Sequence, residues 1–342
     1  MWVLAGCGTP GTSEEPEDRN PASDSIPPVT GPPAAEPVAP LPWEEASRIC
    51  SDLSLWDAAA PEVQEGAARA VAERIRPEPD LPAFRFLRME VFEAGGQRHR
   101  IAVFLHARTG MEFSLVPGGK FVMGSPPEAP DRGERETAHE VTLWASLVSR
   151  TEVMESAWSR IRGKLPEPSR GEDFPVVGVR WHEAADFAQE AGLSLPPEAV
   201  WERACRSGSD SAFYWGDDPA GFEAFAWLES NSGRASQQVS LKKPNAFGLH
   251  DMSGNAWEWC LDWLWDYPEG PVVNPFGPGR QMLIQYRFRT KPEIGLHTGL
   301  HVNRGGAADS PPKEARSAAR AGGFAGDLFA HQGFRLAYPV KP

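Results

Sequence analysis

The sequence has few cysteines, no basic cluster and no long hydrophobic run, and each of these features excludes a class of protein. Its four cysteines include no CxxC pair and no Cys/His spacing typical of a structural zinc site. The net charge of −13 argues against nucleic-acid partners and against binding to anionic lipid. Because no apolar run approaches the length of about 18 residues that a membrane span needs, the sequence predicts no transmembrane helix.

The first recognisable feature of the sequence is a short motif at the N-terminus. The tetrapeptide Leu4–Cys7 resembles a bacterial lipoprotein signal, in which the cysteine, here Cys7, becomes the lipidated first residue. A working signal needs a basic start and an apolar core of about 7–15 residues. The sequence before Cys7 is shorter than that, so we interpret residues 1–7 as the remnant of a signal whose start codon is mis-called. A lipid on Cys7 would place the protein in the cell envelope (periplasm or outer surface) and would be its only contact with a membrane.

Residues 8–42 are rich in Pro, Ser, Glu and Asp and predict a disordered linker. Residues 43–109 predict a small α/β region of two helices (43–53 and 60–76) and two strands (84–92 and 98–107). Gly95 and Gly96 lie between the two strands and indicate a hairpin turn. We interpret this region as a cap that packs on a main domain at residues 110–342.

The main domain starts with short strands and continues into helices. Strands are predicted at 112–116, 120–124 and 141–149, and helices at 151–162, 182–190 and 197–206. Thr151 is the expected N-cap of the first helix, and Pro196-Pro197 begin the third. Beyond Ser207 the regular periodicities fade, so long loops held by aromatic residues are expected.

The stretch from Asn245 to Asp262, NAFGLHDMSGNAWEWCLD, is the most distinctive part of the sequence. In extended backbone Trp257 and Trp259 face one side and Glu258 faces the other. A glycine-broken loop with two carboxylates can present side-chain and carbonyl oxygens to one hard cation. The alternative is an aromatic-rich core turn whose carboxylates cap backbone amides.

This stretch resembles the signature of the formylglycine-generating enzymes, also called sulfatase-modifying factors. The resemblance covers about residues 111–340 and implies a loop-rich α+β fold related to the C-type-lectin scaffold, with little regular secondary structure. It rests on further blocks in the family's order: Pro117–Gly119, FVMGS at 121–125, RTEV at 150–153, PVVGVRW at 175–181, LPPEAVWERAC at 195–205, YWGD at 214–217, Arg304–Gly306, RSAAR at 316–320 and GFR at 333–335.

The resemblance also implies site residues. One structural calcium would be held by the Asp251 side chain, the carbonyls of Gly254 and Ala256, and Glu258. A second calcium of the family would lie near Asn231, but its other ligands have no counterpart here. In some members the cysteine that matches Cys205 pairs with one directly after the GFR motif. Because Leu336 stands at that position here, we interpret Cys205 and Cys260 as small buried hydrophobic residues.

The family's oxidase chemistry uses two cysteine thiolates that bind copper(I), located between the RGG and AAR blocks. Residues 305–320 contain no cysteine, and Asp309 and Ser310 stand in the expected place. Oxygen ligands do not replace thiolates for copper(I), so we expect no copper and assign no catalytic residue. Relatives that use non-haem iron take their ligands from a separate helical bundle, for which the region before residue 110 is too short. His297 and His301 are interpreted as loop histidines near the surface.

We therefore hypothesise a lipid-anchored pseudoenzyme that binds a protein or small-molecule ligand; some members with this fold display variable ligand-binding loops. The insertion at 264–303 is rich in aromatic residues and arginine, which are common at recognition surfaces, although it could equally be a loop that covers the core. Its candidate contact residues are Trp265, Tyr267, Tyr286, Arg287 and Arg289. The competing hypothesis is an atypical metal-dependent oxidase that acts on a cysteine or peptide substrate.

Overall fold

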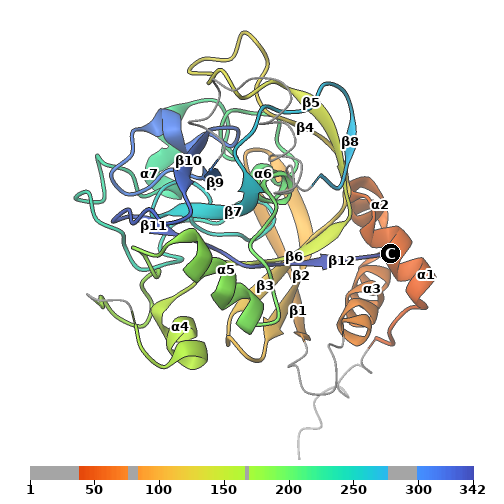
Figure 1. Cartoon of the computed structure of the whole chain (residues 1–342). Coiled ribbons are helices and arrows are strands. Elements are labelled where there is room, and N and C mark those ends of the chain that lie inside the picture. The colour runs from red at the N-terminus through yellow and green to blue at the C-terminus, as the bar shows by residue number, and fades with distance from the viewer. Residues whose placement is uncertain (1–37, 76–83, 166–168, 276–298) are drawn as a thin grey trace, which may run out of the picture. The chain divides into compact units, whose positions relative to one another are not determined.

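The computed structural model describes residues 38–75, 84–165, 169–275 and 299–342, and residues 38–342 form one compact unit (Figure 1). The helices are α1 (Trp43–Cys50), α2 (Leu53–Ala58), α3 (Pro61–Arg74), α4 (Glu155–Arg162), α5 (Trp181–Glu190), α6 (Glu198–Arg206) and α7 (Phe222–Phe225), with 3₁₀ turns η1 (Pro219–Gly221) and η3 (Pro312–Ala315). The strands are β1 (Phe84–Ala94), β2 (Gln97–His106), β3 (Glu112–Val116), β4 (Gly119–Met123), β5 (His139–Leu143), β6 (Ala145–Ser149), β7 (Trp257–Trp263), β8 (Val272–Val273), β9 (Leu300–Arg304), β10 (Arg320–Phe324), β11 (Gln332–Gly333) and β12 (Ala337–Val340).

Three sheets organise these strands. A five-stranded antiparallel sheet has the order β1-β2-β3-β6-β12. A four-stranded sheet has the order β10-β9-β7-β11, and a three-stranded sheet has the order β4-β5-β8. Long loops connect them, so the fold is α+β and loop-rich, as predicted. No helix in the described part of the chain is long and apolar enough to cross a membrane.

The N-terminal elements follow their local sequence signals. Asp52 caps α2 by accepting a hydrogen bond from the Ser54 amide at 2.8 Å. The β1–β2 turn uses Gly95 and Gly96 at φ +57° and +77°, the left-handed region that glycine adopts readily. Both helices and both strands predicted for residues 43–109 are present, with the helices as α1 and α3, whereas the short helix α2 was not predicted. The predicted helices at 182–190 and 197–206 are confirmed as α5 and α6.

Two predictions were wrong because contacts distant in sequence set the backbone. The single strand predicted at 141–149 is two strands in different sheets, β5 and β6, separated at Trp144, whose amide donates to Asn274 Oδ1 at 2.7 Å. The helix predicted from Thr151 begins at Glu155, and Thr151 is not its cap. The Val153 amide instead donates to the carbonyl of Phe334 at 2.8 Å, which holds this residue outside the helix.

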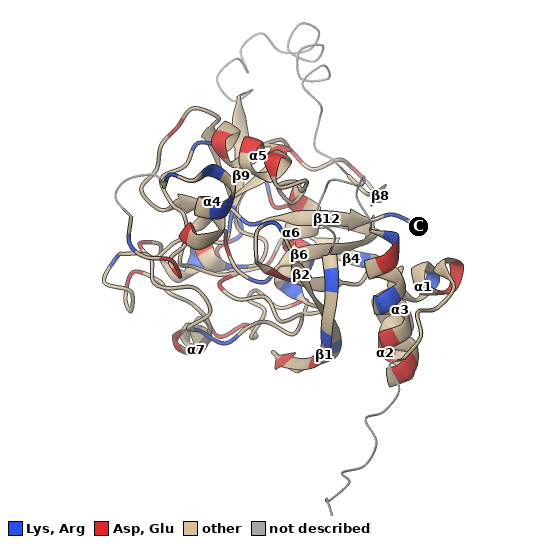
Figure 2. Cartoon of the chain, turned by 90° about the horizontal axis from the view of Figure 1, so that it is seen from below, with Lys and Arg blue, Asp and Glu red and all other residues tan. Residues whose placement is uncertain are grey.

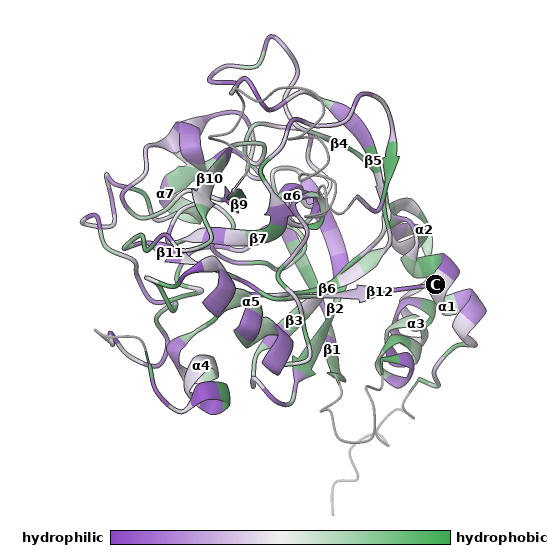
Figure 3. Cartoon of the chain, in the orientation of Figure 1, coloured by the Kyte–Doolittle hydropathy of each residue, from purple (hydrophilic) through white to green (hydrophobic). Residues whose placement is uncertain are grey.

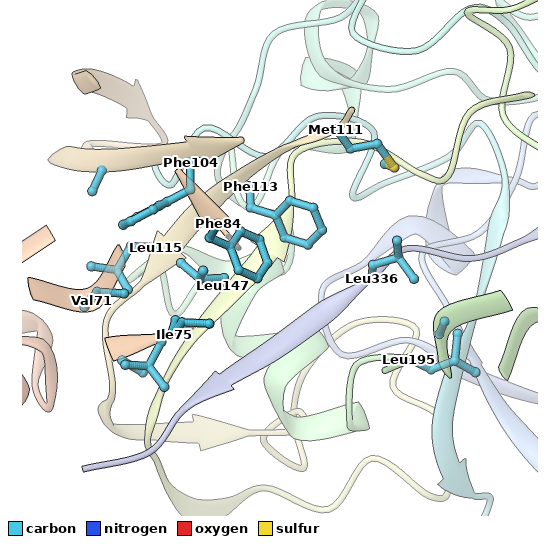
Figure 4. Close-up of a cluster of buried hydrophobic side chains, with 14 of the residues drawn as sticks. Val71, Ile75, Phe84, Phe104, Met111, Phe113, Leu115, Leu147, Leu195 and Leu336 are labelled. Carbon is cyan, nitrogen blue, oxygen red and sulfur yellow. The ribbon is translucent and has the colours of Figure 1, made fainter. Parts of the chain in front are cut away.

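One hydrophobic cluster joins the N-terminal helices to the rest of the chain. It contains Ile49 and Val71 from the helices, Phe104 and Phe113 from the five-stranded sheet, and Leu336 near β12 (Figure 4). Figure 3 shows hydrophobic colour along the central strands and hydrophilic colour on many connecting loops. The region at 43–109 therefore shares its core with the residues that follow it, because β2 pairs directly with β3.

Buried ion pairs link α6 to the strands that follow it in sequence. Glu202 accepts hydrogen bonds from Arg206 Nε at 2.9 Å and from Arg304. Glu198 accepts from Arg320 Nε and Nη2 at 2.8 and 2.6 Å, and lies 3.5 Å from Arg304 Nε. These side chains are almost fully buried. Two carboxylates therefore face three guanidinium groups, and each carboxylate has at least one positive partner away from water.

Candidate functional site

The loop that precedes β7 is held in an unusual backbone conformation. Asp251, Gly254 and Asn255 have φ of +56°, +80° and +62°, all in the left-handed region. A Cβ atom on Gly254 would lie 2.1 Å from the Trp227 carbonyl oxygen, so this position admits only glycine without displacement of the chain. We call residues 251–258 the ion loop, because it contains all four residues for which the resemblance implies calcium binding.

Asp251 has one satisfied and one unsatisfied oxygen. The residue is 1% exposed, and its Oδ2 accepts the Ser240 amide at 2.8 Å, as in the alternative of an amide-capping carboxylate. Its Oδ1 is buried without a hydrogen-bond partner. Burial raises the pKa of Asp251 to about 6. A buried carboxylate oxygen without a partner is costly, so this oxygen is suited to bind a cation.

Glu258 is held by other protein groups. Its side chain accepts from Arg335 Nε and Nη2, each at 2.6 Å, and from Trp201 Nε1 at 2.6 Å. Glu258 lies on β7 and is fully buried. Most of its acceptor capacity is used by these three N–H groups, so it fits a cation less well than Asp251 does.

Glu152 is a buried acid that the sequence analysis did not single out. It is fully buried, and its Oε1 accepts a hydrogen bond from Asn255 Nδ2 in the ion loop at 3.0 Å. Its Oε2 has no hydrogen-bond partner. Burial, then the nearby charges of Asp251 and Glu258, raises the pKa of Glu152 well above its usual range. The only sequence signal was its place in the RTEV block, where a charged residue stands in an otherwise buried stretch.

No three His, Cys, Asp or Glu side chains are grouped to hold a metal in the described ranges. A cation at the ion loop would therefore depend on one or two carboxylates together with main-chain carbonyls. The position near Asn231 is less suitable. Asn231 Oδ1 accepts the Leu228 amide at 2.8 Å, and its amide nitrogen donates to the Ala226 carbonyl at 3.0 Å.

The segment that would carry the copper thiolates forms a compact turn without sulfur. Ser310 is buried; its amide donates to the Ala307 carbonyl at 2.9 Å, and its Oγ accepts the Ala307 amide at 3.1 Å. Arg316 donates to Glu136 at 2.8 and 3.0 Å, an ion pair that ties the segment to the loop before β5. Asp309 lies beside this turn and is 3.8 Å from His331 Nε2.

The three cysteines within the described ranges are free and buried. Burial raises the pKa of Cys50 to about 12 and of Cys205 to about 11, and raises that of Cys260 well above its usual range. Cys205 Sγ lies 3.6 Å from the hydroxyl of Ser317. The interpretation of Cys205 and Cys260 as small buried residues is confirmed.

The proposed recognition residues have different environments. Trp265 is half-buried. Tyr267 donates to Glu198 Oε1 at 3.1 Å, and the Arg320 guanidinium lies 4.0 Å from its ring centroid, so its hydroxyl joins the buried ion pairs. Tyr286, Arg287, Arg289, His297 and Cys7 lie outside the described residues.

His301 was predicted near the surface, and that prediction was wrong. It lies on β9, is 1% exposed, and stacks on Trp181 with ring centroids 3.7 Å apart. Trp263 packs on it at 4.0 Å. Burial lowers the pKa of His301 to about 4, so the ring is neutral at pH 7. The periodicity of this short segment did not indicate a strand.

Two cavities could accept a small ligand. One has a volume of about 410 Å³ and is lined by residues of α2, β2, β4 and α6, including Asp57, His99, Lys120 and Arg203. The other has about 350 Å³ and includes Arg150 and His250, next to the ion loop. His250 is packed there, and its Nδ1 faces the Lys242 carbonyl at 2.9 Å.

Comparisons with known proteins identify the scaffold. The sequence model of the sulfatase-modifying factor enzyme 1-like domain matches residues 102–340. A formylglycine-generating enzyme of Streptomyces coelicolor is 30% identical over 216 residues, which cover 59% of this chain and 67% of that protein. That of Thermomonospora curvata is 38% identical over 125 residues, 31% of this chain and 41% of that protein. The serine/threonine-protein kinase Pkn1 of Chlamydia trachomatis is 28% identical over 276 residues, 79% of this chain and 40% of that protein. The matched region is thus at most about two thirds of these relatives' length.

Solved structures share the fold. Treponema denticola variable protein 1 has a TM-score of 0.58 at 22% identity, over 73% of this chain and 99% of that one. PvdO from Pseudomonas aeruginosa has a TM-score of 0.57 at 24% identity, over 70% and 98%. The order of the sequence motifs, the loop-rich α+β fold and the range that the family model matches all indicate the same family. The chain therefore belongs to the family of sulfatase-modifying factor enzyme 1-like domains.

Proposed function

We propose that this chain is a binding protein that uses the family scaffold without its copper chemistry. The observation that carries the proposal is the composition of residues 305–320, where the family's copper thiolates would stand and where no cysteine is present. The turn at Ser310 and the ion pair of Arg316 with Glu136 occupy this segment. Copper(I) prefers soft sulfur ligands, and serine and carboxylate oxygens do not supply them.

The remaining thiols of the described chain support the same proposal. Cys205 and Cys260 are fully buried, and burial raises the pKa of both thiols. A thiolate is the form that binds a metal or attacks a substrate. Neither cysteine therefore offers a thiolate to a substrate at neutral pH.

A structural calcium ion would stabilise the ion loop. The unpaired Asp251 Oδ1 supports this part of the proposal. When bound, the ion would supply a cross-link between loop segments that have little regular secondary structure. Its role would be structural, since no step of catalysis is assigned to it.

The ligand, a protein or a small molecule, would contact the aromatic-rich insertion at residues 264–303. Trp265 contributes an aromatic side chain there, which supports a recognition role. Nucleic acid is not proposed as a partner. The net charge is −13, and Figure 2 shows both acidic and basic residues along α1 and α3.

We further propose that the chain is lipid-anchored through Cys7 in a bacterial cell envelope. The Leu4–Cys7 motif and the proline-rich residues 8–42 support this placement, because a tethered domain needs a spacer. Mass spectrometry of the mature N-terminus from the native host tests it. An unmodified Met1 would contradict the anchor.

The test of the binding-protein proposal compares this chain with the Streptomyces coelicolor enzyme. Both purified proteins are loaded with copper(I) and incubated in air with a cysteine-bearing peptide. We expect the relative to form aldehyde and this chain to form none and to bind less than one equivalent of copper. Aldehyde production by this chain, with stoichiometric copper, would establish the competing oxidase function.

A second measurement addresses the recognition surface. Full-length protein captures components of an envelope extract, and Trp265→Ala is compared with Lys120→Gln, which changes a residue lining the 410 Å³ cavity. We expect Trp265→Ala to reduce capture at least about fivefold and Lys120→Gln to leave it unchanged. If Lys120→Gln reduces capture and Trp265→Ala does not, the ligand binds at the 410 Å³ cavity and not at Trp265.

A further inference from the structure

Two carboxylate oxygens are buried without a hydrogen-bond partner, and the two acids that carry them influence each other electrostatically. They are Glu152 Oε2 and Asp251 Oδ1, on residues that are 0% and 1% exposed. Each residue does satisfy its other oxygen, through Asn255 Nδ2 and the Ser240 amide respectively. A carboxyl oxygen buried without a hydrogen-bond partner is costly to a fold. The two oxygens are therefore candidates for binding a cation at the ion loop.

The surrounding positive charges, Arg335 for both acids and Lys242 for Asp251, compensate these two acids only in part. Glu152, Asp251 and Glu258 influence one another electrostatically, and Arg335 is the guanidinium within reach of all three. Its Nε and Nη2 donate to Glu258, its Nη1 donates to the Ser149 carbonyl at 3.0 Å, and Nη2 also reaches the His250 carbonyl at 2.9 Å. Arg335 therefore neutralises Glu258 and has no donor directed at the other two carboxylates.

Asn255 fixes Glu152 against the ion loop. Its Oδ1 accepts the Gln237 amide at 2.7 Å, which orients the side-chain amide so that Nδ2 points to Glu152 Oε1. The Asn255 carbonyl accepts the Ala308 amide at 3.1 Å. The side chain is thus held from several directions, and Glu152 is positioned by the same loop that contributes Asp251.

We propose that Glu152 is a ligand of the hard divalent cation at the ion loop, with Oε2 and Asp251 Oδ1 as its two anionic donors. This inference rests on the calcium part of the proposed function and changes its ligand set. Glu258, already held by Arg335 and Trp201, orients β7 beside the site rather than supplying the second negative charge. Two carboxylate donors and main-chain carbonyls form the all-oxygen environment that calcium prefers.

The test measures cation affinity and stoichiometry of the full chain, without any activity assay. Chelator-treated protein is titrated with calcium, following the thermal midpoint and calorimetric binding, and with terbium, following luminescence sensitised by the tryptophans. Glu152→Gln and Asp251→Asn keep side-chain volume and remove one charge each. Glu190→Gln is the matched control, because Glu190 pairs with Arg162 at the surface.

We expect one equivalent of calcium in the wild type and in Glu190→Gln, and an affinity reduced about tenfold or more in Glu152→Gln and in Asp251→Asn. Without calcium, Glu152→Gln should have a thermal midpoint at least as high as that of the wild type, because the amide carries no charge that the buried site must neutralise. If Glu152→Gln does not fold, Glu152→Asp replaces it; this variant keeps the charge but shortens the reach, and weaker binding is again expected.

The outcomes separate this inference from the proposed function. Unchanged affinity in the Glu152 variant, with loss in Asp251→Asn, overturns the role of Glu152 and leaves the calcium site in place. Absence of any calcium response in the wild type removes the site itself and both proposals about it. Equal losses in all three variants, the Glu190→Gln control included, would show a nonspecific electrostatic effect and would also overturn the assignment.

Discussion

At the scale of single residues, the arginines of the family motifs act in pairs with buried acids. Arg335 of the GFR block binds Glu258 of the ion loop, and Arg304 of the RGG block binds Glu202 of α6. These two motif arginines therefore mark internal ion pairs. The sequence indicated that Glu258 and Asp251 belong to one site, but it could not show that Glu258 is neutralised by a residue 77 positions later.

Breaking the Glu258–Arg335 pair should be strongly destabilising. Glu258→Gln leaves the fully buried Arg335 without its counter-charge, and we expect a loss of about 3–5 kcal/mol in the free energy of unfolding. The control Glu190→Gln removes a surface pair and should cost at most about 1 kcal/mol. Urea denaturation monitored by tryptophan fluorescence measures both. Similar losses in the two variants would show that the buried pair contributes no more than a surface one.

Because a Glu258 variant is expected to be destabilised, loss of its calcium response would not distinguish unfolding from loss of a ligand. Asp251→Asn is therefore the better test of the calcium site.

At the scale of helices and strands, local signals predicted most of the regular structure. Gly95-Gly96, the Pro197 start of α6 and the apolar spacing of α5 depend on residues that are close in sequence. The start of α4 and the division between β5 and β6 depend on Phe334, Asn274 and the two sheet partners of these strands. Glu152 was missed for the same reason, because its environment is assembled from residues about 100 positions away.

The two turn glycines should respond differently to the same substitution. A Cβ on Gly95 would lie 2.3 Å from the Tyr214 carbonyl oxygen, whereas one on Gly96 would meet no atom within 4 Å. Gly96→Ala should cost about 1–2 kcal/mol, the cost of a left-handed alanine. Gly95→Ala should cost clearly more, since the backbone at Tyr214 must also move. Urea unfolding compares the two variants, and equal losses would contradict the close approach of this turn to Tyr214.

At the scale of the whole molecule, the matched family region does not coincide with the folding unit. The match begins at residue 102, inside β2, while β1 and the N-terminal helices belong to the same hydrophobic cluster as Phe334. Because β2 pairs with β1 over its full length, residues 84–94 complete the five-stranded sheet. The region at 43–109 is thus part of the domain's core.

A chain shortened to residues 102–342 should therefore lose cooperative unfolding. It would lack β1 and α1–α3 and would expose apolar side chains such as Phe104, which is fully buried in the intact unit. A chain of residues 38–342 serves as the control and should unfold in a single transition. Near-UV circular dichroism and urea titration measure both. A cooperative transition in the shorter chain, with the same midpoint, would show that the N-terminal helices add little to stability.

The position of β12 has a consequence for biosynthesis. Ser149 at the end of β6 bonds to Leu336, 187 residues later, so the β6 edge is without its native neighbour while the intervening chain is made. At roughly 5–20 residues per second, that interval lasts about 10–40 seconds on the ribosome. An open edge strand can pair with other chains. Translation speed and chaperone capture during this interval should therefore influence the yield of native protein.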